Sequence, residues 1–184
     1  MHQEIVAVHN AGEKSVRHFA SGVHFIHPIE PCLGAYAGKP FQVACRGEFD
    51  NAAALRQQAG VTNFHSMLHA EIIVHLLKRR ERELPLLPAL VDVLNEVRGT
   101  YALVLIWGET LLASRCGTGK QSLFTGMCDG VLLVASEPGL FSTHGAAVEQ
   151  ELPVGEVFCQ IANRLPIWAT PSRPIHMRVG REVH

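Results

Sequence analysis

The chain has 184 residues, a length that suits one domain or slightly more and argues against a two-domain enzyme. Hydrophobic residues make up 47% of it and charged residues 18%, while 16 Lys and Arg nearly balance 17 Asp and Glu. This composition excludes a disordered chain and a nucleic-acid binder that depends on net charge. The unusual feature is the 11 histidines, a count that first suggests metal binding or catalysis.

The five cysteines and the start of the chain indicate where the protein resides. No two cysteines have C-x-x-C spacing, and their number is odd. The first ten residues, MHQEIVAVHN, contain no charged region followed by an apolar run, and no segment approaches 18 uninterrupted apolar residues. We therefore expect a cytoplasmic protein with reduced thiols and no membrane segment.

The first part of the chain predicts short strands. Residues 4–9 and 15–20 alternate apolar and polar side chains around a turn at residues 10–12, which predicts a β-hairpin. A looser stretch with several prolines and glycines follows. Residues 41–45 are then a continuous apolar run, typical of a buried strand.

Three helices are predicted next. The first follows Asp50 or Asn51 as N-cap and ends near Gly60. The second covers about residues 69–83 and ends in a mixed charge run, which predicts a solvated last turn rather than a binding patch. The third follows Pro85, with apolar residues at helical spacing up to Val97.

From residue 101 the pattern returns to strands. Residues 101–107, 111–115, 122–127 and 131–136 are separated by short turns, which predicts an antiparallel meander. The first of these strands has no polar face, so both of its faces must be covered. A single helical turn at 137–141, a strand at 155–161 and an extended tail that packs through Trp168 complete the chain. The order of strands, helices and strands predicts a layered α+β domain.

Taken alone, the chemically interesting residues are weak candidates. Residues 114–120 lack the first glycine and the Ser or Thr of a phosphate-binding P-loop, so a tight turn is favoured. His65 and His69 have the spacing of two metal ligands on a helix, but ordinary hydrogen-bonded histidines are favoured. Cys45 precedes Arg46, whose charge could lower the thiol pKa, and Cys45 is therefore a minor candidate nucleophile.

Several motifs in a fixed order resemble class II glutamine amidotransferases, in particular the glutaminase domain of asparagine synthetases, and also amidophosphoribosyltransferases. The matching segments cover about residues 22–160 and are Phe41 to Leu55 with the following Arg56, Ser66 to Leu77, Arg98 to Trp107, Leu111 to Arg115, Gly119 to Leu123, Gly130, Val134 to Pro138 and Leu152 to Glu156. The resemblance implies an N-terminal-nucleophile hydrolase fold, a four-layer αββα sandwich of two antiparallel sheets. We expect residues 1–162 to form this domain and residues 163–184 the extended C-terminal tail.

The resemblance also implies a site that this chain has altered. The family uses an N-terminal Cys as nucleophile, whereas residue 2 here is His2. Arg46 replaces the Asn that donates to the oxyanion, although the neighbouring Gly47 is retained. His69 replaces the Asp that binds the glutamine ammonium group. The Arg that would bind the glutamine carboxylate is not recognisable at residues 22–28.

These changes predict a glutaminase-like domain without glutamine hydrolysis, more a pseudoenzyme than an enzyme. It would serve as a binding or scaffold subunit for a synthetase or transferase partner, or associate with itself, and would use no metal, cofactor, nucleic acid or membrane. A small anionic ligand could occupy the remnant pocket, whose residues would be Arg46, Gly47, Glu48, His69 and Glu71. Two alternatives remain open: an enzyme with Cys45 as a relocated nucleophile, or a mis-assigned start that omits an N-terminal Cys.

Overall fold

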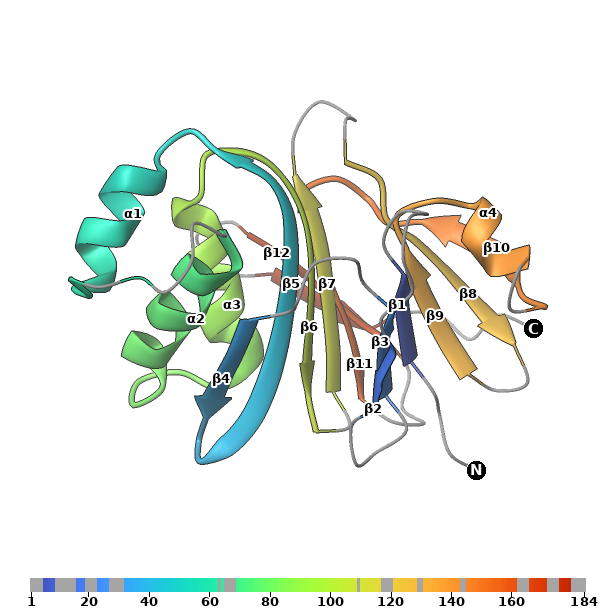
Figure 1. Cartoon of the computed structure of the whole chain (residues 1–184), viewed down its shortest axis with the longest axis horizontal. Helices are drawn as coiled ribbons and strands as arrows, with labels where there is room; N and C mark the ends of the chain where they lie inside the picture. Colours follow the sequence, from blue (N-terminus) through green and yellow to red (C-terminus); the bar gives the residue numbers. More distant parts are fainter. Residues whose placement is uncertain are drawn as a thin grey trace.

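A computed structural model describes most of the chain (Figure 1). The described residues are 5–8, 16–18, 23–26, 32–62, 64, 69–108, 110–116, 121–128, 131–142, 145–161, 166–171 and 176–179. His65 and residues 117–120, where a tight turn is predicted, lie outside them.

A seven-stranded sheet forms the centre of the molecule. Its strand order is β13-β12-β11-β7-β6-β5-β4, and all of its pairs are antiparallel. The strands are β4 (Cys32–Tyr36), β5 (Lys39–Phe49), β6 (Gly99–Trp107), β7 (Thr110–Cys116), β11 (Val157–Ile161), β12 (Ile167–Thr170) and β13 (His176–Val179).

A six-stranded sheet faces it, in the order β10-β8-β9-β1-β3-β2. Its strands are β1 (Ile5–Val8), β2 (Val16–His18), β3 (Val23–Ile26), β8 (Phe124–Cys128), β9 (Val131–Ala135) and β10 (Ala147–Glu151). The pairs are antiparallel except at β1, which runs parallel to both β3 and β9.

Helices cover the outer faces of the two sheets. α1 (Ala52–Ala59), α2 (His69–Arg80) and α3 (Leu86–Glu96) lie on the side of the seven-stranded sheet, and α4 (Gly139–Ser142) lies beside β9 and β10 (Figure 1). The predicted αββα order is therefore present. In the described part of the chain the second helical layer is this single turn.

Three apolar clusters occupy the spaces between these layers. β6 contributes to two of them, because Tyr101, Leu103 and Leu105 pack toward the helices while the alternating residues Ala102, Val104 and Ile106 pack toward the other sheet. The third cluster lies around Phe141 of α4. The prediction that this strand is covered on both faces is confirmed.

Two of the predicted strand pairings are wrong. The strands at residues 5–8 and 16–18 do not form a hairpin with each other, because β3 lies between them. The four-strand meander is interrupted after β7, since β8 belongs to the other sheet. Alternation identifies a strand but does not say which neighbour it pairs with.

The sheet also continues beyond the predicted domain boundary at residue 162. β12 pairs with β11, and Trp168 packs edge-on against Phe158 at 5.1 Å in the cluster between the sheets. The described parts of the segment predicted as an extended tail thus form strands of the sheet, because the apolar run Ile167–Ala169 continues the core.

The predicted caps and ends of the helices agree in part with the structure. α1 ends at Gly60, in the left-handed conformation, as predicted. Asn51 precedes it but makes no side-chain cap; its amide instead donates to Glu96 O at 2.8 Å and accepts from Arg98 N–H at 3.0 Å. Asn51 therefore joins the start of α1 to the end of α3.

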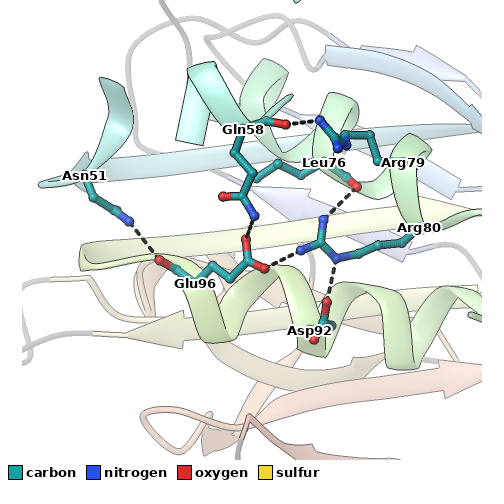
Figure 2. A network of polar contacts seen from close by, with 7 residues as sticks. All are labelled: Asn51, Gln58, Leu76, Arg79, Arg80, Asp92 and Glu96. Atoms are coloured by element: carbon teal, nitrogen blue, oxygen red, sulfur yellow. Dashed lines mark hydrogen bonds and ion pairs between the residues drawn. The ribbon is translucent and has the colours of Figure 1, made fainter. Parts of the chain in front are cut away.

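One residue of the charge run at the end of α2, Arg80, has a structural role. Arg80 has a side chain only 12% exposed, and its guanidinium donates to Asp92 at 2.7 Å, to Glu96 at 2.5 Å and to Leu76 O at 3.1 Å (Figure 2). Gln58 of α1 donates to the same Glu96 carboxylate at 2.5 Å. The prediction of a solvated turn is wrong for Arg80, whose ion pairs link α2 to α3, while Gln58 connects α1 to the same Glu96 carboxylate.

Replacing Arg80 by Met should lower the free energy of unfolding by about 2 kcal/mol, since two partly buried carboxylates lose their partner. Urea denaturation would measure this loss. The matched control is Arg82→Met at an exposed position of the same run, which should change stability by less than about 0.5 kcal/mol. Equal effects of the two substitutions would contradict the structural role of Arg80.

Candidate functional site

The candidate site is built on a close approach between β5 and β6. Gly47 has a φ of 122°, and a Cβ there would lie 2.0 Å from the carbonyl oxygen of Thr100. On the facing strand, Gly99 has a φ of 121°, and its Cβ would lie 2.2 Å from the carbonyl oxygen of Glu48. Only glycine fits at both positions.

His69, the first residue of α2, holds this part of β5. Its Nδ1 lies 3.0 Å from Gly47 O, and the Phe49 N–H donates to Nε2 at 3.5 Å. Its ring also stacks on Phe49, with centroids 4.4 Å apart. Because a carbonyl oxygen can only accept, Nδ1 carries the proton and Nε2 is the acceptor. Both ring nitrogens of His69 are thus engaged by the backbone of β5.

Arg46 and Glu48 lie on the other face of β5. Side chains alternate along a strand, and Ala44 packs in the cluster between the sheets. Arg46 and Glu48 share that face and are exposed, whereas Cys45 packs toward the helices. The structure therefore separates the predicted pocket residues Arg46 and Glu48 from His69, although Gly47 is close to both.

Glu71 is a third part of the predicted pocket. It is 7% exposed, and its carboxylate lies 3.7 Å from His75 Nε2, one helical turn further along. Two residues along a helix correspond to a rotation of about 200°, so Glu71 and His69 point to different sides of α2. Glu71 is placed among the packed residues of α2 rather than beside Gly47.

The environment of Cys45 raises the pKa of its thiol, whereas the sequence predicted a lowered pKa. Burial, and to a smaller extent the neighbouring thiol of Cys32, raise the pKa of the Cys45 thiol to about 12. The expected lowering by Arg46 is wrong, because consecutive residues of a strand point to opposite faces. At neutral pH this thiol is protonated and therefore a poor nucleophile.

Tyr101 is a residue of this region that the sequence analysis did not single out. It lies opposite Gly47 in the β5–β6 register and contacts Phe49 edge-on at 6.0 Å. Burial raises the pKa of its hydroxyl above the ordinary value, while a hydrogen bond with Ser114 acts in the opposite direction. A tyrosine at the start of an apolar run gives no signal that would separate it from ordinary core.

The described residues include neither a metal-binding cluster nor a membrane-spanning helix. They contain no group of three or more His, Cys, Asp or Glu side chains that could hold a metal ion. No helix among them is both long enough and apolar enough to cross a bilayer.

The substitution Gly47→Ala should destabilise the protein by at least about 3 kcal/mol, because the new methyl group would collide with the backbone of β6. Thermal and urea unfolding would measure the loss. Gly108→Ala is the matched control: Gly108 also has a positive φ, 57°, but a Cβ there meets nothing within 4 Å. We expect it to cost about 1 kcal/mol. Similar losses would contradict the close approach of the strands.

Comparison with known proteins identifies the domain. A family model described as "Glutamine amidotransferase domain" matches residues 29–143, more than half of the chain. The amidophosphoribosyltransferase of Methanothermobacter thermautotrophicus is 28% identical over 151 residues, which are 80% of this chain and 32% of that protein. That of Staphylococcus aureus strain Mu50 is 29% identical over 144 residues, 77% of this chain and 29% of that protein. The chain spans about a third of the length of the curated relatives it matches.

Two solved structures have the same fold. One is the glutamine phosphoribosylpyrophosphate amidotransferase from B. subtilis complexed with ADP and GMP, with a TM-score of 0.68 and 22% identity over 82% of this chain and 31% of that chain. The other is described as the allosteric regulatory enzyme of purine biosynthesis, with a TM-score of 0.71 and 24% identity over 78% of this chain and 31% of that chain. The predicted α+β sandwich of the N-terminal-nucleophile type is confirmed, and the chain belongs to the glutamine amidotransferase domain family.

Proposed function

We propose that this glutamine amidotransferase-like domain does not hydrolyse glutamine and acts as a binding or scaffold subunit for a biosynthetic enzyme. The observation that carries the proposal is the position of His69. The resemblance to the family expects at this place an Asp that binds the ammonium group of glutamine. Here the side chain is an imidazole, and both of its nitrogens bond the backbone of β5 instead.

Two further observations support the loss of hydrolysis. Arg46 stands where the resemblance expects an oxyanion donor, and loss of one such donor typically costs about 10²–10³ in rate. Cys45 cannot readily replace the nucleophile, because its thiol has a pKa of about 12.

The proposed partner is a synthetase or transferase chain. The amidophosphoribosyltransferases that match this chain are about three times as long as the segment they share with it. Because these relatives are named as transferases, a transferase or synthetase is the partner we favour, in a cytoplasmic setting.

The enzymatic alternative can be tested directly. With excess glutamine at pH 7.5, the protein should release ammonia no faster than a buffer blank, while an active amidotransferase in the same assay serves as the positive control. A thiol-directed glutamine analogue should leave Cys45 unmodified by mass spectrometry, because a negligible fraction of this thiol is ionised at that pH. Ammonia release together with a stoichiometric adduct on Cys45 would overturn the proposal.

A small anion in the remnant pocket is the second part of the proposal. Arg46 offers a cation on the exposed sheet face beside Gly47, and Glu48 places a negative charge two residues away on the same face. The bound anion would therefore lie toward Arg46 and away from Glu48. Opposite charges at this spacing predict opposite effects of the two side chains on anion affinity.

Calorimetry with inorganic pyrophosphate would test this pocket. Arg46→Ala should weaken binding at least about tenfold, and Glu48→Gln should strengthen it, because a repulsive charge is removed. The matched control is Arg98→Ala, an exposed arginine beyond the Gly47–Tyr101 pair, which should leave the affinity unchanged. Absence of pyrophosphate binding, or equal losses for Arg46 and Arg98, would refute the anion site without affecting the conclusion on hydrolysis.

A further inference from the structure

The edge of the seven-stranded sheet at β4 has an unusual composition. β4 (CLGAY) contains no charged residue, and in the described part of the chain it is the last strand of its sheet (Figure 1). Leu33, its second residue, is 66% exposed, more than the other exposed large apolar side chains of the described residues. Edge strands usually carry charges, prolines or bulges that prevent pairing with other chains.

The hairpin that β4 forms with β5 determines which backbone groups point outward. Ala37 and Gly38 have φ values of 49° and 72° and form a two-residue turn that is closed by the pair Tyr36 and Lys39. In an antiparallel pair, hydrogen-bonded and non-hydrogen-bonded positions alternate from this closing pair. The N–H and C=O groups of Leu33 and Ala35 therefore point away from β5, toward the open edge.

The opposite edge of the molecule shows the protection that β4 lacks. β10 is the last described strand of the six-stranded sheet, and all five of its residues are exposed. It carries Glu149 and Glu151 and has a register irregularity between Val148 and Gln150. Two copies joined through β10 would bring carboxylates close together, whereas two copies joined through β4 would meet no like charge within the strand.

We propose that β4 pairs antiparallel with β4 of a second copy of this chain around a two-fold axis at Gly34. Leu33 would then form hydrogen-bonded pairs with the partner's Ala35, and the symmetry repeats this pair on the other side of the axis. Gly34 would face the partner's Gly34 at the non-hydrogen-bonded position, where the strands come closest. The two seven-stranded sheets would join into one continuous sheet.

The surroundings of β4 suit this arrangement. On one face, α2 packs on β4, where a Cβ at Gly34 would lie 2.9 Å from Val74. On the other face, the exposed side chains of Leu33 and the partner's Ala35 would lie opposite each other and bury apolar surface. The contact area of a five-residue strand is small, so the dimer should be weak and depend on concentration. It does not require the anion site or the proposed loss of hydrolysis.

Sedimentation equilibrium of the full chain over a range of concentrations tests the dimer. The wild type should dimerise. Leu33→Lys should weaken association at least about tenfold, because two lysines would approach the interface. Ala35→Pro should do the same by removing an outward N–H that has no role in the β4–β5 hairpin.

Val154→Lys is the matched control, since Val154 is also an exposed apolar residue, 50% exposed, but lies in a turn far from β4 in sequence. It should dimerise like the wild type. Circular dichroism would verify that each variant is folded. A wild type that stays monomeric, or a dimer that Val154→Lys weakens as much as Leu33→Lys, would overturn the proposal. The proposal would also be overturned if the wild type stayed monomeric and bound a different protein through Leu33. In that case the β4 edge would be an interface for that other protein.

Discussion

The close approach of β5 and β6 at Gly47 and Gly99 is the constraint on which the rest of the site depends. It fixes the backbone of β5 where the strand passes the start of α2, and it allows the imidazole of His69 to bond two backbone groups of that strand. His69 in turn orients α2, whose far end carries Arg80 and its bonds to α3. The helical layer is thus attached to the sheet at one end of α2 and cross-linked at the other.

This arrangement is compatible with the proposed loss of hydrolysis, because the backbone of the site is held by contacts within the sheet. The residues that keep the backbone in place, Gly47 and Gly99, are retained, and they serve the sheet whether or not a substrate binds. Arg46 and His69, the positions at which the resemblance implies other residues, have separate surroundings. Arg46 is exposed on the face of β5 opposite the helices, whereas His69 stacks on Phe49.

Burial and helix ends, which depend on the local residue pattern, could be predicted from the sequence. The pairing of strands could not. The apolar run at residues 101–107 implied burial on both faces, and Gly60 implied the end of α1; the structure has both. The position of β3 between β1 and β2 follows from long-range packing, which alternation does not encode. At the site, the resemblance assigned Gly47 and His69 to one pocket, and the structure places His69 Nδ1 3.0 Å from Gly47 O. The motifs could not show that the adjacent residues Cys45 and Arg46 face different layers. Because Cys45 faces the helices and is buried, the pKa of its thiol is raised.

The pairing of β1 with β9 has a consequence for synthesis on the ribosome. Val6 lies beside Leu133, and β12, which closes on β11, begins only at Ile167. Neither sheet can be completed until most of the chain has left the ribosome. Until then, the strands that are synthesised first lack the strands with which they pair in the folded protein. Such non-local contacts slow folding and lengthen the time during which apolar strands are unprotected. A nascent chain of this kind would benefit from a chaperone, or from an early encounter with its partner.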